Sequence, residues 1–155
     1  MATVFDVADY FLAKTEVEAE ERMTHLKVQK LVFYAQGFSL AIMDKPLFSN
    51  PIEAWKHGPV SPDLYKKYRD SGSNPIDVVP ADEEEAAGAM RQAAKPFTAE
   101  QADLLDDVYN TFGQFSAWRL RELSHETTCW QDAYPDGTIT HAAMKAFFET
   151  QIASD

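Results

Sequence analysis

The sequence has one cysteine, Cys129, and no long run of apolar residues. A single cysteine cannot form a disulfide within its own chain, so a disulfide-stapled fold is excluded. Residues 1–3 do not resemble the start of a signal peptide, and no segment reaches the roughly 20 apolar residues that a membrane-spanning helix needs. We therefore expect a cytoplasmic protein with no membrane partner.

Motifs of catalysis and metal binding are also lacking. There is no Gly-rich phosphate loop and no His-Glu-x-x-His pattern. His125 and Cys129 are four residues apart, a spacing at which two side chains on a helix can bind one metal ion. A transition-metal site, however, needs three or four such ligands. Ser124 directly precedes His125, and adjacent residues rarely reach the geometry of a nucleophile and its base. We predict no catalytic residue, no metal and no cofactor; a hydrolase or metal enzyme is the least favoured function. His125 is expected to bond the backbone while Trp130 fills the core.

Apolar residues are frequent enough for one core. The chain has 155 residues, of which 45% are apolar, and it contains 10 Phe, 6 Tyr and 3 Trp. A chain of this length can bury a core without disulfides or metals. No repeat, low-complexity tract or linker divides the sequence, which predicts a single domain over residues 1–155.

Negative charge is concentrated in the second half of the chain. Residues 1–70 hold ten acidic and nine basic residues, whereas residues 71–155 hold fifteen acidic and five basic residues. A surface of this sign repels phosphate backbones and attracts basic proteins. Direct binding of nucleic acid is therefore disfavoured, although the acids could serve only to keep the domain soluble.

Helical periodicity covers most of the chain and predicts a mainly α fold: a single compact helical domain of six to seven helices with a short extended segment. The extended segment is expected at residues 76–79, and residues 124–130 are expected to be a loop. Residues 52–56 are too short and too mixed to assign. The predicted helices span residues 3–14, 24–42, 62–69, 81–94, 98–112, 116–123 and 140–152.

The helix predicted from residue 24 is apolar nearly all round, so we expect it at the centre of the fold. Its polar exceptions are informative. Lys27 and Lys30 are three residues apart and Gln29 and Gln36 are seven apart, so each pair can share one face. The lysines either extend their stems to water or project together toward a partner.

Residues 52–62 place a large aromatic side chain, two basic or titratable side chains and a Gly-Pro turn just before a helix start at Ser61. This combination suits recognition of a partner better than bond-making, because it is the composition of interface hot spots. The alternative is that Trp55 belongs to the core and Gly58-Pro59 only shapes the entry to a helix. The candidate partner-binding residues are Lys27, Lys30, Trp55, Lys56, His57, Ser61 and Tyr65.

Several stretches together resemble the Panacea domain family of SocA-like antitoxins and GepA-like phage-associated proteins. They are Leu26–Gly37, Ile52–Pro62 with Tyr65, Gly72–Ile76, and Leu123–Glu126 followed by Trp130. The resemblance covers nearly the whole chain in the correct order, but residues 81–95 do not follow the family's pattern.

This resemblance implies an antitoxin that neutralises a cognate toxin by direct contact. For SocA-like members it further implies an adaptor that delivers the toxin to an AAA+ protease such as ClpXP. The alternative function is a phage or prophage accessory module that binds a host protein.

Overall fold

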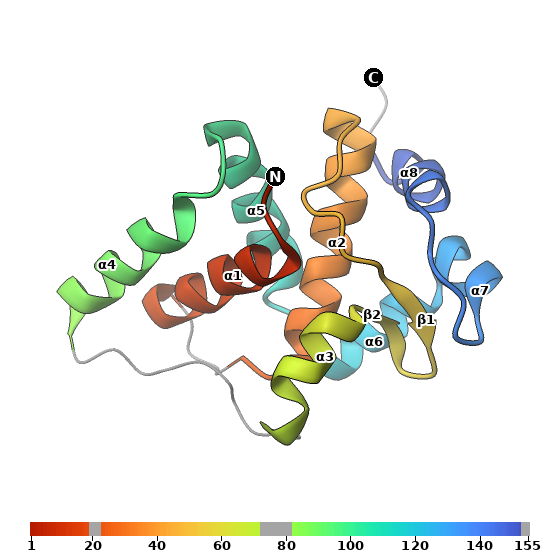
Figure 1. Cartoon of the computed structure of the whole chain (residues 1–155), viewed down its shortest axis with the longest axis horizontal. Coiled ribbons are helices and arrows are strands. Elements are labelled where there is room, and N and C mark those ends of the chain that lie inside the picture. The colour runs from red at the N-terminus through yellow and green to blue at the C-terminus, as the bar shows by residue number, and fades with distance from the viewer. Residues whose placement is uncertain (19–22, 72–81, 153–155) are drawn as a thin grey trace.

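The computed structural model describes residues 1–18, 23–71 and 82–152, which contain eight α-helices, a two-stranded antiparallel sheet and a short 3-10 helix (Figure 1). The prediction of a mainly α fold is confirmed. The elements are α1 (Val4–Glu18), α2 (His25–Met43), β1 (Glu53–Trp55), β2 (Gly58–Val60), α3 (Pro62–Tyr68), η1 (Arg69–Ser71), α4 (Glu83–Ala94), α5 (Ala99–Phe112), α6 (Ala117–His125), α7 (Thr128–Ala133) and α8 (His141–Glu149).

Helix α2 runs through the middle of the molecule, as its apolar character predicts. Figure 1 shows α1, α4 and α5 on one side of α2, α7 and α8 on the other, and α3, α6 and the two strands near its first turns. Thr24 caps the start of the helix, where its hydroxyl accepts from the Lys27 backbone N–H. Asp44, which has a left-handed backbone conformation, caps its end.

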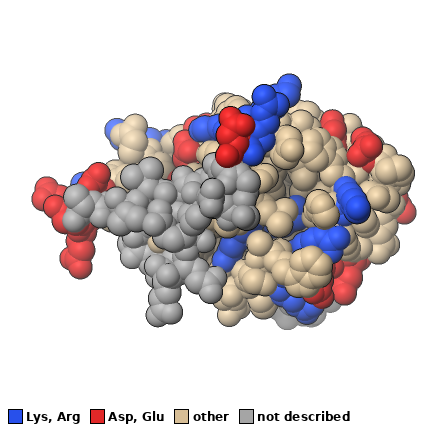
Figure 2. Space-filling view, turned by 90° about the horizontal axis from the view of Figure 1, so that it is seen from below, with Lys and Arg blue, Asp and Glu red and all other residues tan. Residues whose placement is uncertain are grey.

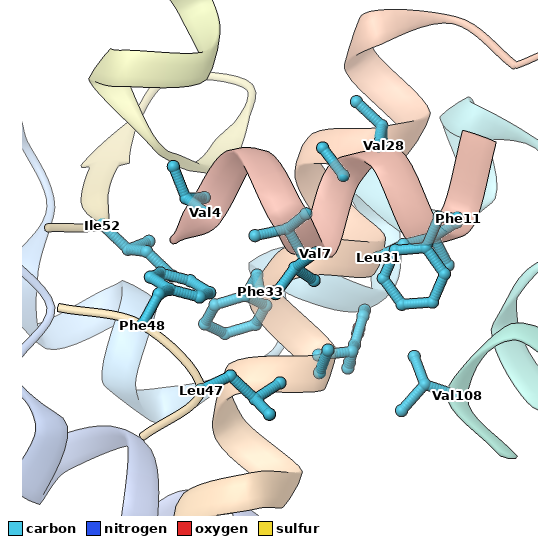
Figure 3. Close-up of a cluster of buried hydrophobic side chains, with 14 of the residues drawn as sticks. Val4, Val7, Phe11, Val28, Leu31, Phe33, Leu47, Phe48, Ile52 and Val108 are labelled. Carbon is cyan, nitrogen blue, oxygen red and sulfur yellow. The ribbon is translucent and has the colours of Figure 1, made fainter. Parts of the chain in front are cut away.

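The core lies between α1, α2 and α5 and extends to the segment after α2 (Figure 3). Its side chains are spaced three and four residues apart along α1 and α2, so each helix turns an apolar face toward the other. The residues labelled in this core are Val4, Val7, Phe11, Val28, Leu31, Phe33, Leu47, Phe48, Ile52 and Val108.

Side-chain caps set most helix starts where the sequence predicts them. Ser61 accepts from the Leu64 N–H at the start of α3, and Thr98 and Gln101 form a reciprocal capping box at α5. Ser116 and Thr140 cap α6 and α8 in the same manner. Helix α1 continues to Glu18 and is thus longer than predicted.

Two sequence-based expectations differ from the structure or lie outside it. The loop predicted over residues 124–130 is wrong, because α6 extends through His125 and α7 begins at Thr128. Side-chain hydroxyls close this tight connection: Ser124 Oγ donates to the Arg121 carbonyl, and Thr127 Oγ1 donates to the Ser124 carbonyl. The extended segment predicted at residues 76–79 lies outside the described residues.

Candidate functional site

The unassigned residues 52–56 contain β1, the first strand of a β-hairpin. In this hairpin Glu53 pairs with Val60 and Trp55 with Gly58, which leaves Lys56 and His57 at the tip. Gly58 has a φ of 113°, a conformation that side chains with a Cβ rarely adopt. The other edge of β1 pairs with residues 136–139 through backbone hydrogen bonds, so the hairpin is held on both sides.

Helix α2 fixes the returning strand of the hairpin by buried side-chain hydrogen bonds. Gln29 Nε2 donates to the Ser61 carbonyl at 3.0 Å, and the Ser61 N–H donates to Gln29 Oε1 at 2.8 Å. Lys30 is fully buried, and its Nζ donates to the Pro59 carbonyl at 3.2 Å. Burial, with a smaller contribution from the charge of Arg121, lowers the pKa of Lys30 to about 7.

Gln36 forms a similar pair of hydrogen bonds with the segment that follows α2. Its amide nitrogen donates to the Phe48 carbonyl at 2.8 Å, and its amide oxygen accepts from the Leu47 N–H at 2.8 Å. Ser39 Oγ donates to the Lys45 carbonyl in the same segment. The buried polar side chains of α2 therefore hold residues 45–61. Because this segment is not helical, its buried backbone N–H and carbonyl groups need such hydrogen-bond partners.

A pocket of about 620 Å³ opens beside the hairpin, between the start of α2, the start of α3 and the start of α6. The Trp55 and Tyr65 rings form one wall, in edge contact with centroids 5.1 Å apart. Leu26 and Val60 add apolar surface. His25 also lines the pocket; its Nδ1 atom is buried and has no hydrogen-bond partner among the described residues, and burial lowers its pKa. The pocket is thus mainly apolar and aromatic.

Two functional candidates on α6, Trp118 and Arg121, were not among the residues chosen from the sequence. Trp118 is 62% exposed, and the Arg121 guanidinium lies over its ring, 4.8 Å from the centroid. Arg121 Nε also donates to His57 Nδ1 at 3.3 Å, so α6 and the hairpin tip form one continuous surface. The spacing of Trp118 and Arg121, one helical turn apart, was the signal in the sequence.

We call this region the hairpin surface: Trp55, Lys56, His57, Tyr65, Trp118 and Arg121. Figure 2 views the molecule from the end where α3 and the hairpin lie in Figure 1. On this face blue basic side chains surround tan surface, and red acidic side chains lie mostly toward the edges. Among the six residues of the hairpin surface, Lys56 and Arg121 are basic and none is acidic, although the whole chain has a formal net charge of −11.

Comparison with known proteins places this fold in a family. The model of the family described as antitoxin SocA-like, Panacea domain, matches residues 28–131, a range that includes all of the hairpin surface. The chain belongs to this SocA-like Panacea family.

A curated relative of this Panacea domain is Antitoxin SocA from Caulobacter vibrioides (strain NA1000 / CB15N). The two are 27% identical over 122 residues, which cover 79% of this chain and 65% of the relative. The chain thus spans about 65% of the length of this relative. No solved structure matches the chain.

The candidate residues chosen from the sequence occupy different positions in the Panacea domain. Trp55, Lys56, His57 and Tyr65 surround the pocket, and Tyr65 is 38% exposed. Ser61 and Lys30 are buried behind the hairpin and support it through the hydrogen bonds described above. Lys30 thus does not extend its stem to water. Lys27 does not line the pocket, and its Nζ donates to the Gly113 carbonyl at 2.6 Å.

His125 and Cys129 have structural surroundings in this Panacea domain. The His125 ring stacks on Trp130 at 4.3 Å and bonds the Lys56 backbone, while Trp130 donates to the Trp55 carbonyl. Burial and Arg121 lower the pKa of His125. Over residues 1–18, 23–71 and 82–152, no three His, Cys, Asp or Glu residues gather closely enough for a metal ion. Within the same ranges no helix is both long and apolar enough to cross a bilayer.

Proposed function

We propose that this protein is an antitoxin that neutralises a cognate toxin by direct contact through the hairpin surface. The observation that carries the proposal is an apolar pocket walled by Trp55 and Tyr65, joined through His57 to the Trp118–Arg121 pair of α6. All of these residues lie within the segment that matches the family. Tryptophan, tyrosine and arginine are the residues most enriched at the energetic centres of protein interfaces.

The exposed rings supply the driving force in this proposal. Trp118 and Tyr65 present apolar area to water, and a partner that covers them gains the free energy of removing that area from solvent. Lys56 is exposed at the hairpin tip, where a charged group sets orientation and association rate more than affinity. The pocket between Trp55 and Tyr65 is suited to an apolar side chain of the toxin.

Rigidity is the second support for the proposal. The hairpin backbone is bonded to α2 by Gln29 and Lys30 and to residues 136–139 on its other edge. A surface that is ordered before binding loses less conformational entropy when the partner docks. The buried side chains of α2 thus contribute to affinity indirectly, by positioning the hairpin.

The test is co-expression with the product of the neighbouring open reading frame, scored by growth and by copurification. The variant carries Lys56→Ala, His57→Ala and Trp118→Ala, three exposed positions whose truncation leaves the core intact. We expect it to keep the wild-type melting temperature but to lose both rescue of growth and the complex. A matched control carries Lys145→Ala and Glu149→Ala in α8 and Ile152→Ala just after it. Helix α8 lies away from the hairpin (Figure 1), so this control should rescue fully.

The other outcomes separate the finer possibilities. Rescue in which the neighbour disappears only when an AAA+ protease is present would indicate delivery for proteolysis rather than simple blocking. A harmless neighbour that forms no complex would overturn the proposal and favour an accessory module that binds a host protein. Full rescue by the hairpin variant would mean that the toxin contacts a different surface of the protein.

A further inference from the structure

A second groove lies on a different part of the molecule, between the C-terminal half of α2 and α5. Its volume is about 860 Å³, and it shares no lining residue with the hairpin pocket. Phe38 and Ile42 of α2 and Leu104 and Val108 of α5 contribute apolar surface. Ile42 is 58% exposed, although the rest of α2 is largely buried. The groove thus leaves apolar surface open to solvent in the described part of the chain.

One wall of the groove is acidic. Glu100, Asp103 and Asp107 occupy positions i, i+3 and i+7 of α5, so they form one row along the helix, about 10 Å long. Within the described ranges none of the three forms a salt bridge. The neighbouring Asp106, in contrast, accepts from Tyr10 and pairs with Lys14. Lys45 is the only basic residue among the described residues that line the groove.

The stability of α5 does not account for this row. Asp is among the weaker helix formers, and Asp103 and Asp107 lie beyond the first turn, where an acid would favour the helix dipole. A row of acids beside exposed apolar side chains instead matches a ligand with the complementary pattern. Such a ligand presents apolar residues to Ile42 and Leu104 and basic residues to the acids.

We propose that this groove binds an amphipathic helix of a partner protein, with an apolar stripe flanked by Lys or Arg. The helix lies between α2 and α5 as a third packed helix, its stripe on Phe38, Ile42 and Leu104. Its basic side chains reach Glu100, Asp103 and Asp107. The proposal does not depend on the hairpin surface, because the two sites share no lining residue and can be occupied together.

The probe is a synthetic 15-residue helical peptide with Leu at helical spacing and Lys beside each Leu, measured by fluorescence anisotropy at two salt concentrations. A second peptide has the same composition in scrambled order, and a third has Glu in place of Lys. We expect the first peptide to bind at least about tenfold more tightly than the other two, and more weakly at high salt.

Two matched variants locate the binding. Asp103→Asn with Asp107→Asn removes two charges from the groove, and Glu83→Gln with Glu84→Gln removes two from exposed positions of α4. The groove variant should weaken binding about tenfold and the α4 variant much less. Ile42→Ser, at an exposed site, should weaken binding without unfolding the protein.

Three results would overturn the inference. Equal weakening by the groove and α4 variants, or equal binding of the scrambled peptide, would mean attraction to net charge alone. Equal binding of the Glu peptide would mean that the acids play no part. Self-association of the chain that Ile42→Ser abolishes, without peptide binding, would assign the groove to a second copy of this protein.

Discussion

Gln29 and Ser61 exchange two hydrogen bonds, one in each direction, across 32 positions of the sequence. The side-chain amide thus satisfies the Ser61 N–H and carbonyl as a neighbouring strand would. Gln36 does the same for the Leu47 N–H and the Phe48 carbonyl. The two glutamines lie two helical turns apart on α2, so one helix holds two irregular segments by the same chemistry.

Replacing Gln29 by Met should strongly destabilise the protein. The side chain would keep its volume, but the buried Ser61 N–H would lose its partner, and the Ser61 carbonyl would keep only the hydrogen bond from the Tyr65 N–H. Because an unpaired buried group costs about 1–3 kcal/mol and the lost carbonyl bond adds to this, the free energy of unfolding should fall by about 2 kcal/mol. Urea denaturation measures this loss, and amide hydrogen exchange at Ser61 should become faster than in the wild type.

Gln114 provides the matched control for this substitution. It is exposed, and its side chain donates a local hydrogen bond to the Thr111 carbonyl. Gln114→Met should change the free energy of unfolding by less than about 0.5 kcal/mol. A Gln29→Met protein as stable as the control would show that the hairpin does not need the amide of α2.

The buried amine of Lys30 should make stability depend on pH. Its pKa is about 7 in the folded protein and near 10.5 when unfolded. Between these values the unfolded chain holds a proton that the folded chain lacks, so the free energy of unfolding rises with pH. The slope contributed by Lys30 is at most about 1.4 kcal/mol per pH unit. Lys30→Met should remove this contribution, which urea denaturation at pH 7, 8 and 9 measures.

The quantity to compare is the difference in the pH slope of the free energy of unfolding between the wild type and Lys30→Met. Burial raises the pKa of Tyr34 and Tyr68, which opposes the Lys30 effect at higher pH, but this contribution is common to both proteins. Lys66 is exposed in α3, and Lys66→Met should keep the wild-type slope. If Lys30→Met also keeps that slope, the buried amine is protonated in the folded protein throughout this range.

Alanine substitutions at two helical glycines should change the free energy of unfolding in opposite directions. A Cβ on Gly37 would overlap the Phe148 ring, because α8 packs directly against α2 there. Gly37→Ala should lower the free energy of unfolding by about 1–3 kcal/mol despite the better helix propensity of alanine. Gly88 lies in α4, where the nearest described atom to an added Cβ is in the Arg91 side chain at 3.7 Å, so Gly88→Ala should stabilise by about 0.5–1 kcal/mol. Thermal or urea unfolding of both variants checks the signs; destabilisation by both would refute the packing argument.

Helix positions were predictable because their signals are local. Side-chain caps at Thr24, Ser61 and Thr98 act within three residues, and apolar periodicity follows from the helix itself. Helix α7 was missed because it is only one to two turns long, and a short helix has no periodicity to read. The hairpin was missed because much of its stability comes from Gln29, Lys30 and residues 136–139, which are distant in sequence.

The candidate site was predictable only in part for the same reason. Trp55, Lys56, His57 and Tyr65 are close in sequence, and their composition indicates an interaction surface. Lys30 looked like a projecting side chain because its partner, the Pro59 carbonyl, can be identified only in three dimensions. Arg121 joined the site through a contact with His57, 64 positions away.

Substitutions at Gly58 and at His57 should distinguish loss of hairpin stability from loss of a toxin contact. Its positive φ disfavours any side chain, and an added Cβ would lie 2.7 Å from both Lys30 Cε and Ser124 Oγ. Backbone strain and overpacking each cost about 1–3 kcal/mol, so Gly58→Ala should lower the free energy of unfolding by at least about 2 kcal/mol. Urea denaturation measures the loss.

His57, the preceding residue, is the matched control because it is exposed at the tip of the same turn. His57→Ala should change the free energy of unfolding by less than about 0.5 kcal/mol. Neutralisation of the toxin should then fail in the two variants for different reasons. Gly58→Ala should recover function when the temperature is lowered enough to keep it folded, whereas a defect of His57→Ala should persist. Equal stability of the two variants would contradict the tight packing of Gly58 against Lys30 and Ser124.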